Sequence, residues 1–251
     1  MADFFSYELT NLQWMLIIFS ALLIGMSKTG ISGAGMAVIP IMAAIFGGKL
    51  STGIVLPLLS MADVFAVSYY HRHANWSYVL KLLPWTVVGV IIGIYVGDII
   101  SDAMFKDIMG VIVMLSVGIL VWKDLKKDVR IPGGILFPVV MGLAGGFTTM
   151  VGNAAGAIMA LYLLSMRLPK NEYIGTGAWF FLIINLFKIP FHILVWKTIS
   201  WESFSFDLVL LPIIAVGAVM GIYLIKIIPE KAYRVFLLVT TAISALVLLI
   251  R

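Results

Sequence analysis

The chain has 251 residues, of which 62% are hydrophobic and 12% charged, whereas a soluble domain carries roughly 45–50% apolar and about 25% charged residues. This composition excludes a soluble globular protein and predicts an all-α multipass membrane protein. The absence of cysteine excludes disulfides and thiolate metal sites, and we expect no cofactor. The net charge of +5 fits cationic loops on the cytoplasmic face better than nucleic-acid binding.

Ten apolar segments follow one another along the chain, in two sets of five. They lie at about 11–27, 35–47, 51–70, 78–100 and 104–122 and, after a polar linker at 123–130, at about 133–148, 152–166, 172–196, 206–228 and 232–250. Residues 82–95 (LLPWTVVGVIIGIY) and 210–223 (LLPIIAVGAVMGIY) share Pro, two Gly and Tyr at a constant offset of 128. We therefore expect one membrane domain built from two duplicated halves, 1–127 and 128–251, as in many secondary transporters.

The first two segments of each half are short, and a glycine-rich break separates them. A helix of about 13 residues rises only about 20 Å, against a hydrocarbon core of about 30 Å. If each short pair is one broken helix, the flanking Lys and Arg divide eight against seven between the two sides; if each pair is a hairpin, they divide eleven against four. The positive-inside rule favours the hairpin, with the 123–130 linker in the cytoplasm and both termini outside. The halves then run in opposite directions, as an inverted repeat, and the hairpins either span fully or turn back within the membrane.

The two breaks are candidate substrate contacts. Unpaired backbone groups at membrane depth survive only where protein buries them or where they line a wet cavity. Helices that start near Gly35 and Gly156 would present their N-termini, which attract anions. Ser32 and Asn153 correspond at an offset of 121 and are preferred N-cap types, so that both, together with Gly33, are expected to bind substrate. Close helix packing by small residues is the alternative explanation of the breaks.

The glycine pattern of the first break also carries a family resemblance. Residues 30–35 (GISGAG), followed by Pro40 and repeated more weakly around Gly152 and Gly156, resemble the TauE/SafE sulfite-exporter family of membrane permeases over nearly the whole chain. The resemblance implies a multipass carrier of sulfur-containing anions such as sulfite or sulfonates.

Few ionisable side chains lie deep in the apolar segments, where burial is costly and a functional role is the default expectation. Asp63 corresponds to Asn185 at an offset of 122, and Lys188 and His192 follow Asn185 on one helix face. We expect Asn185, Lys188 and His192 to bind the anion, with Asp63 either the ion-pair partner of Lys188 or the protonation switch that couples transport. A purely structural Asp63–Lys188 pair is the alternative. Lys28, at the first break, either contacts substrate or extends to the cytoplasmic surface.

Two further patterns concern helix packing and the membrane interface. A glycine ladder at Gly89, Gly93 and Gly97, with a copy at Gly217 and Gly221, predicts close helix contacts within the chain or between subunits of a homo-oligomer. Tryptophans near segment ends, Trp196 among them, are expected in an aromatic belt at the interface.

The sequence as a whole predicts a secondary transporter in the inner (plasma) membrane. By the resemblance its substrate is a sulfur oxyanion or organosulfonate, held at helix N-termini near the midplane and carried by alternating access. The expected partners are a small anionic substrate and the lipid bilayer. A passive anion channel of the same architecture is one alternative. An intramembrane serine protease is another, because residues 30–33 (GISG) match a rhomboid-type motif with His192 as base, but the match is weak in a chain with 23 glycines, and no enzyme is predicted.

Overall fold

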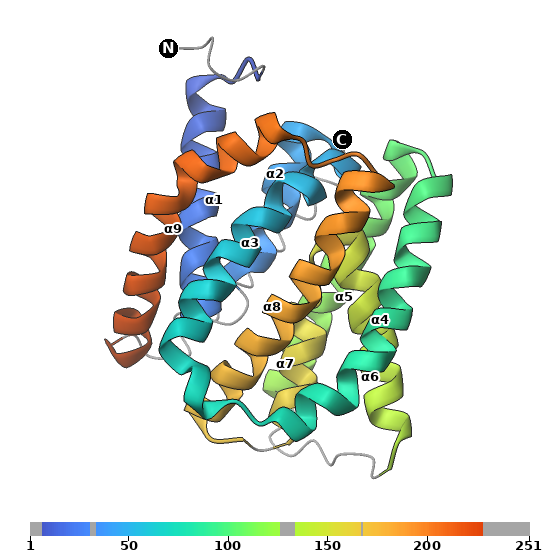
Figure 1. The fold of residues 1–251 in the computed structure, drawn as a ribbon, viewed down its shortest axis with the longest axis vertical. Coiled ribbons are helices and arrows are strands. Elements are labelled where there is room, and N and C mark those ends of the chain that lie inside the picture. The colour runs from blue at the N-terminus through green and yellow to red at the C-terminus, as the bar shows by residue number, and fades with distance from the viewer. Residues whose placement is uncertain (1–6, 31–33, 126–133, 167, 228–251) are drawn as a thin grey trace.

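The computed structural model describes residues 7–30, 34–125, 134–166 and 168–227, and within these ranges every regular element is a helix (Figure 1). The elements are α1 (Asn11–Thr29), η1 (Ala34–Ala37), α2 (Val38–Phe46), α3 (Gly48–Tyr70), η2 (His71–His73), α4 (Trp76–Ile99), α5 (Asp102–Leu125), α6 (Leu136–Gly152), α7 (Gly156–Ser165), α8 (Lys170–Leu194) and α9 (Trp201–Ile227). They coincide with the first nine predicted segments, which confirms the all-α multipass class. The expected segment at 232–250 lies outside the described residues.

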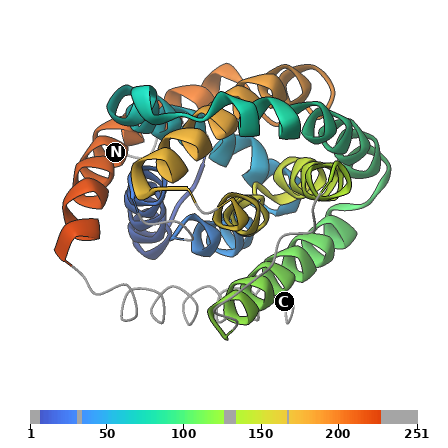
Figure 2. The same ribbon diagram turned by 90° about the horizontal axis from the view of Figure 1, so that it is seen from below.

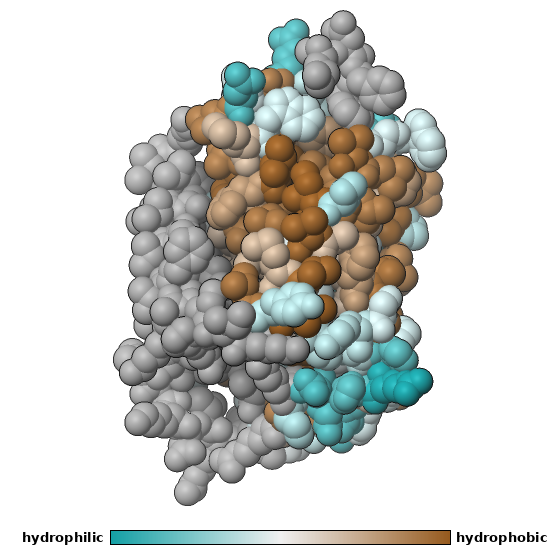
Figure 3. All heavy atoms as spheres, turned by 90° about the vertical axis from the view of Figure 1, so that its left-hand side faces the viewer, coloured by the Kyte–Doolittle hydropathy of each residue, from teal (hydrophilic) through white to brown (hydrophobic). Residues whose placement is uncertain are grey.

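The described surface is that of a membrane protein. Five described helices, α1, α3, α4, α8 and α9, are long and apolar enough to cross a membrane. The face in Figure 3 carries an apolar band between more polar ends. On α9 the side chains of Val209, Val216 and Val219 are more than half exposed. Such a contiguous apolar surface is stable against lipid and not against water.

Each short pair of segments is a hairpin. The ring of Tyr7, just before α1, packs edge-on against Phe46 at the end of α2, with centroids 5.3 Å apart. In the second half Phe137, at the start of α6, stacks on Tyr162 in the last part of α7, at 5.8 Å. The second helix of each pair therefore returns to the end where the first began. The returning helices, Ala34–Phe46 and α7, are too short to span the hydrocarbon core.

Glycines hold the two halves together at corresponding positions. Helix α1 packs against α9, and α4 packs against α6 (Figure 1). A Cβ atom on Gly25 would collide with the backbone of α9 at Gly217, and one on Gly146 would collide with the backbone of α4 at Gly89. Gly25 corresponds to Gly146 at an offset of 121, and Gly89 to Gly217 at 128. The contacts of these ladder glycines are therefore within the chain, the first of the two alternatives.

Helices α3 and α8 lie side by side in the centre of the molecule (Figures 1 and 2). One hydrophobic cluster gathers around α1, α2, α3 and α9, and another around α4 to α8. Polar side chains on the central pair therefore meet between two apolar clusters, away from lipid.

Candidate functional site

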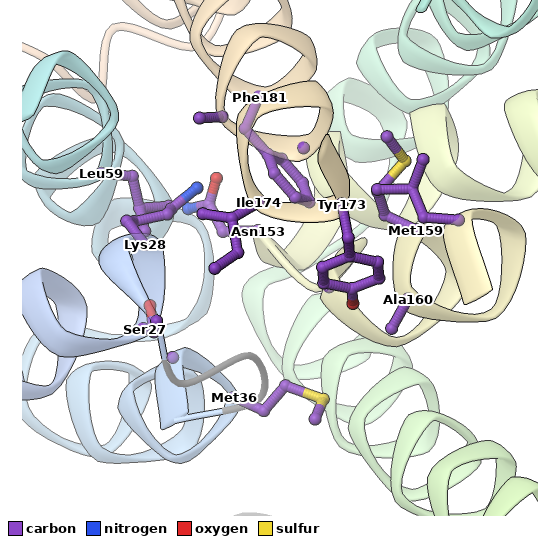
Figure 4. Close-up of a pocket in the computed structure, with 16 residues that line it drawn as sticks. Ser27, Lys28, Met36, Leu59, Asn153, Met159, Ala160, Tyr173, Ile174 and Phe181 are labelled. Atoms are coloured by element: carbon purple, nitrogen blue, oxygen red, sulfur yellow. The ribbon is translucent and has the colours of Figure 1, made fainter. Parts of the chain in front are cut away.

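A cavity of about 100 Å³ lies where the two glycine-rich breaks come together (Figure 4). Lys28 and Gly35 line it from the first break, Asn153 and Gly156 from the second, and Phe181 from α8. A space of this size holds a small ion or several waters. The expectation that the breaks lie at a cavity therefore agrees with the geometry of the described residues.

Lys28 sits in the last turn of α1, where the helix dipole favours a cation. Its Nζ lies 2.9 Å from Oδ1 of Asp63 and 4.1 Å from the ring centroid of Phe181. The Lys28 side chain is 12% exposed and that of Asp63 is fully buried. Lys28 therefore does not extend to the cytoplasmic surface; it forms an ion pair at the cavity wall.

Asp63 is held from both halves of the chain. Lys28 pairs with one carboxylate oxygen, and the side-chain amide of Asn185 donates a 2.7 Å hydrogen bond to the other. The expected Asp63–Lys188 ion pair is replaced by these two contacts. The reason is local: Asn185 lies one turn before Lys188 on α8 and faces α3, while α1 ends close enough for Lys28 to reach the carboxylate.

Lys188 is fully buried and its ammonium group contacts neutral oxygens. Nζ donates to Oδ1 of Asn153 at 2.7 Å, to Oγ1 of Thr149 at 3.2 Å and to Oδ1 of Asn185 at 3.4 Å. Within the described ranges no carboxylate forms a salt bridge with it. The ammonium group thus has three acceptors, but its charge has no counter-ion in the part of the chain that the structure describes.

Asn153 ends α6 and does not cap α7, in contrast to the expected N-cap. It adopts a left-handed conformation (φ 53°, ψ 25°) and donates its backbone N–H to Thr149, a conformation that Asn tolerates better than most residues. Its Nδ2 donates to the carbonyl oxygen of Thr52 on α3 at 3.1 Å, while Oδ1 accepts from Lys188. Asn153 therefore connects α3 to α8 and separates Lys188 from the cavity.

Helix α7 begins beside the cavity. Gly156, its first residue, lines the cavity, and among the described residues outside its own helix and chain neighbours no atom lies within 4 Å of the position that a Cβ would occupy there. The first N–H groups of a helix have no intrahelical acceptor. The start of α7 is therefore an open approach to backbone donors.

The other predicted site residues lie elsewhere. His192 is buried and does not line the cavity; its Nδ1 is 2.8 Å from Oγ1 of Thr198, in the α8–α9 connection. Ser32 and Gly33 lie outside the described residues, so their contacts stay predictions. Thr149 was not predicted, although its correspondence with Lys28 points to it. No sequence pattern marks Phe181 as a site residue, because a single aromatic residue in an apolar helix is common.

Comparison with known proteins gives a family. The model of the sulfite exporter TauE/SafE family matches residues 17–248. Two curated relatives are the probable membrane transporter protein MamO of Magnetospirillum gryphiswaldense and that of Paramagnetospirillum magneticum, each 22% identical over 224 residues, covering 70% of this chain and 34% of the relative. The chain thus spans about a third of the length of these relatives, and no solved structure matches. Because the family model covers most of the chain, this membrane protein belongs to the sulfite exporter TauE/SafE family.

Proposed function

We propose that this chain is a secondary transporter that carries a small anion, a sulfur oxyanion or an organosulfonate, across the membrane by alternating access. The observation that carries the proposal is the fully buried ammonium of Lys188, which contacts three neutral oxygens, one of them on Asn153 at the cavity wall. A transporter, and not an enzyme, also agrees with the family and with the names of the relatives.

The charges at the centre of the molecule favour an anion. When ionised, Lys28 and Asp63 cancel, and Lys188 leaves one net positive charge. A buried charge is costly unless it is paired. In the second half Thr149 and Asn185 occupy the positions of Lys28 and Asp63, so this half has no carboxylate at the position that corresponds to Asp63. An anion in the cavity would supply the missing negative charge.

The cavity offers donors on several sides. Lys28 and Asn153 line it, and α7 begins there at Gly156. An oxyanion can accept hydrogen bonds from the Lys28 ammonium and from the first N–H groups of α7. Lys188 attracts it from behind Asn153, and direct contact requires the Asn153 side chain to turn aside.

Alternating access fits an inverted repeat with a cytoplasmic 123–130 linker. Two observations support it. Helices α1 and α9 run parallel, because Leu22 contacts Gly217 and, one turn later in both helices, Met26 contacts Gly221. Helices α4 and α6 run parallel in the same way. The hairpin geometry of the short pairs matches the more asymmetric division of flanking charge. The site would then lie between two halves that rock about it.

Thermal unfolding of the purified protein in detergent tests the anion site. Sulfite, sulfate, thiosulfate, sulfoacetate, taurine and acetate are compared; a ligand at 100 times its Kd stabilises the folded state by about 2.7 kcal/mol. We expect Lys188→Met to fold without added anion, because the variant carries no uncompensated buried charge at this position, and to lose the anion-dependent shift. Lys81→Met, an exposed lysine at the start of α4, should keep it. A full shift in Lys188→Met would overturn the proposal.

Proteoliposomes distinguish the carrier from a channel. A carrier shows saturable uptake of labelled sulfite that unlabelled sulfite inside the vesicle accelerates. The reason is that the binding site can return across the membrane loaded with unlabelled sulfite. Flux without exchange acceleration would favour a channel.

A further inference from the structure

We propose that His192 and Lys49 form a second anion-binding station, on the far side of Lys188 from the cavity, which Trp196 occludes in this conformation. The inference rests on the proposed function and adds the route by which the anion leaves the cavity. Its ligand is the same small oxyanion, bound by a ring N–H and an ammonium group.

His192 is a buried donor group with one nitrogen unused. The side chain is fully buried, and Nδ1 lies 2.8 Å from the hydroxyl of Thr198, whose backbone N–H donates to the His192 carbonyl at 2.8 Å. Among the described residues Nε2 has no hydrogen-bond partner. Native structures satisfy nearly all buried polar atoms, so an unused one calls for a ligand or a function. An oxyanion can accept from this ring nitrogen.

Basic groups lie on both sides of His192. Lys188 precedes it by one turn on the same face of α8, and Lys49 lies beyond Trp196, whose ring packs on His192. Lys49 stands at the start of α3, with Nζ 3.5 Å from Asp98, and its side chain is 25% exposed. Lys28, Lys188, His192 and Lys49 therefore follow one another from the cavity to a solvent-accessible edge of the molecule.

Trp196 fills the space between His192 and Lys49. Its ring centroid lies 4.9 Å from that of His192, and the ammonium of Lys49 lies 5.1 Å from its ring. The indole N–H donates to the carbonyl oxygen of Ile94 at 3.2 Å, and the ring packs on Gly97, where any Cβ would collide with it. Trp196 is thus a buried plug, 6% exposed, and not the interfacial anchor that its place near a segment end predicts.

The repeat explains why this end is closed while the other holds a cavity. Gly53 on α3 packs against Thr198 after Trp196, and its counterpart Gly175 on α8 packs against the backbone at Ala74. Ala74 and Trp196 correspond at an offset of 122. At corresponding positions of the connections that follow α3 and α8, the cavity end therefore carries the methyl group of Ala74 and the opposite end the indole of Trp196. Alternating access requires one closed side, and this indole closes it.

Exchange kinetics test the station separately from the cavity. In proteoliposomes, we expect His192→Gln and Lys49→Met to slow sulfite exchange by about tenfold or more, while the sulfite-dependent thermal shift stays within twofold of the unmodified protein in apparent affinity. Lys106→Met is the matched control, a lysine at the same end that pairs with Asp102. Exchange at the unmodified rate in both variants overturns the station. Loss of the thermal shift in either variant also overturns it, because that residue then belongs to the cavity site.

Thiol accessibility tests the plug, since the chain has no cysteine. We expect His192→Cys to react slowly with an anionic methanethiosulfonate reagent, and Trp196→Ala in that background to accelerate the reaction by about tenfold or more, with the anionic reagent reacting faster than a cationic one of similar size. An unchanged rate, or equal rates for the two reagents, overturns the inference. If the unmodified protein shows no sulfite-dependent thermal shift at all, the proposed function fails instead, whatever the labelling rates.

Discussion

The side-chain amide of Asn185 donates a 2.7 Å hydrogen bond to the carboxylate of Asp63, and the two residues correspond in the sequence at an offset of 122. In the proposed repeat, a contact between corresponding residues lies where the two copies meet. Two carboxylates at this distance would repel each other unless they shared a proton. The replacement of one carboxylate by an amide turns that repulsion into a hydrogen bond, and Lys28 then neutralises the remaining charge at 2.9 Å.

The Lys28–Asp63 pair is expected to stabilise the fold strongly. Removing one partner of a buried pair costs about 3–5 kcal/mol, so Asp63→Asn and Lys28→Met should each lower the unfolding temperature in detergent. The double variant should recover part of the loss, because neither charge then remains unpaired. The control is Lys49–Asp98, whose side chains are 25% and 54% exposed; exposed pairs contribute about 0–1 kcal/mol. Additive losses in the double variant would contradict a direct pair.

Asn153→Asp is expected to imitate a bound anion. The new carboxylate would stand where Oδ1 of Asn153 now accepts from Lys188 at 2.7 Å, so the buried ammonium gains a fixed counter-ion. We expect a higher unfolding temperature without anion and no further increase when sulfite is added. Asn153→Gly keeps the left-handed backbone without a side chain and should retain a sulfite-dependent shift. A normal shift in Asn153→Asp would show that Lys188 does not act on the anion.

Much of the fold could be predicted because composition and periodicity are properties of single segments. The helix positions, the two breaks and the correspondence of Asp63 with Asn185 all follow from such patterns. The partner of Asp63 could not be predicted, because the approach of Lys28 depends on how α1 packs between α3 and α8. The burial of Trp196 could not be predicted either. A tryptophan near a segment end has the same local sequence whether it faces lipid or, as in this structure, packs on Gly97 and Phe105.

The site was predictable in part for the same reason. The polar stripe on α8 is visible in the sequence, and in the structure Lys188 of this stripe donates hydrogen bonds to Thr149, Asn153 and Asn185. The sequence gives no sign that the stripe has separate parts. In the structure Asn185 faces Asp63 on α3, Lys188 faces Asn153 at the second break, and His192 faces the α8–α9 connection. The conformation of Asn153 depends on where α6 ends, and segment ends are the least certain part of a sequence-based assignment.

Gly146→Ala is expected to destabilise the protein, while Gly145→Ala is not. A Cβ at Gly146 would collide with the backbone of α4 at Thr86, whereas at Gly145 the nearest atom, on Ile158, is 3.6 Å away. Overpacking a tight contact costs about 1–3 kcal/mol, and backbone atoms cannot move aside as a flexible side chain can. Thermal unfolding of the two variants measures the difference. Equal unfolding temperatures would mean that α4 and α6 are not in this close contact.

The orientation of the two halves can be tested at His73 and Trp201, both exposed and 128 residues apart. They follow corresponding helices, α3 and α8, and Figure 1 places η2 and the α8–α9 connection at opposite ends of the molecule. In an inverted repeat, corresponding connections lie on opposite sides of the membrane. We expect a membrane-impermeant maleimide to label Trp201→Cys in intact cells and His73→Cys only after permeabilisation, because flanking Arg72 and Lys81 favour the cytoplasm. The cysteine-free chain provides the unlabelled background. Labelling of both variants from the same side would mean that the halves run in parallel, and the site could not then be exposed alternately by rocking two inverted copies about Asp63 and Asn185.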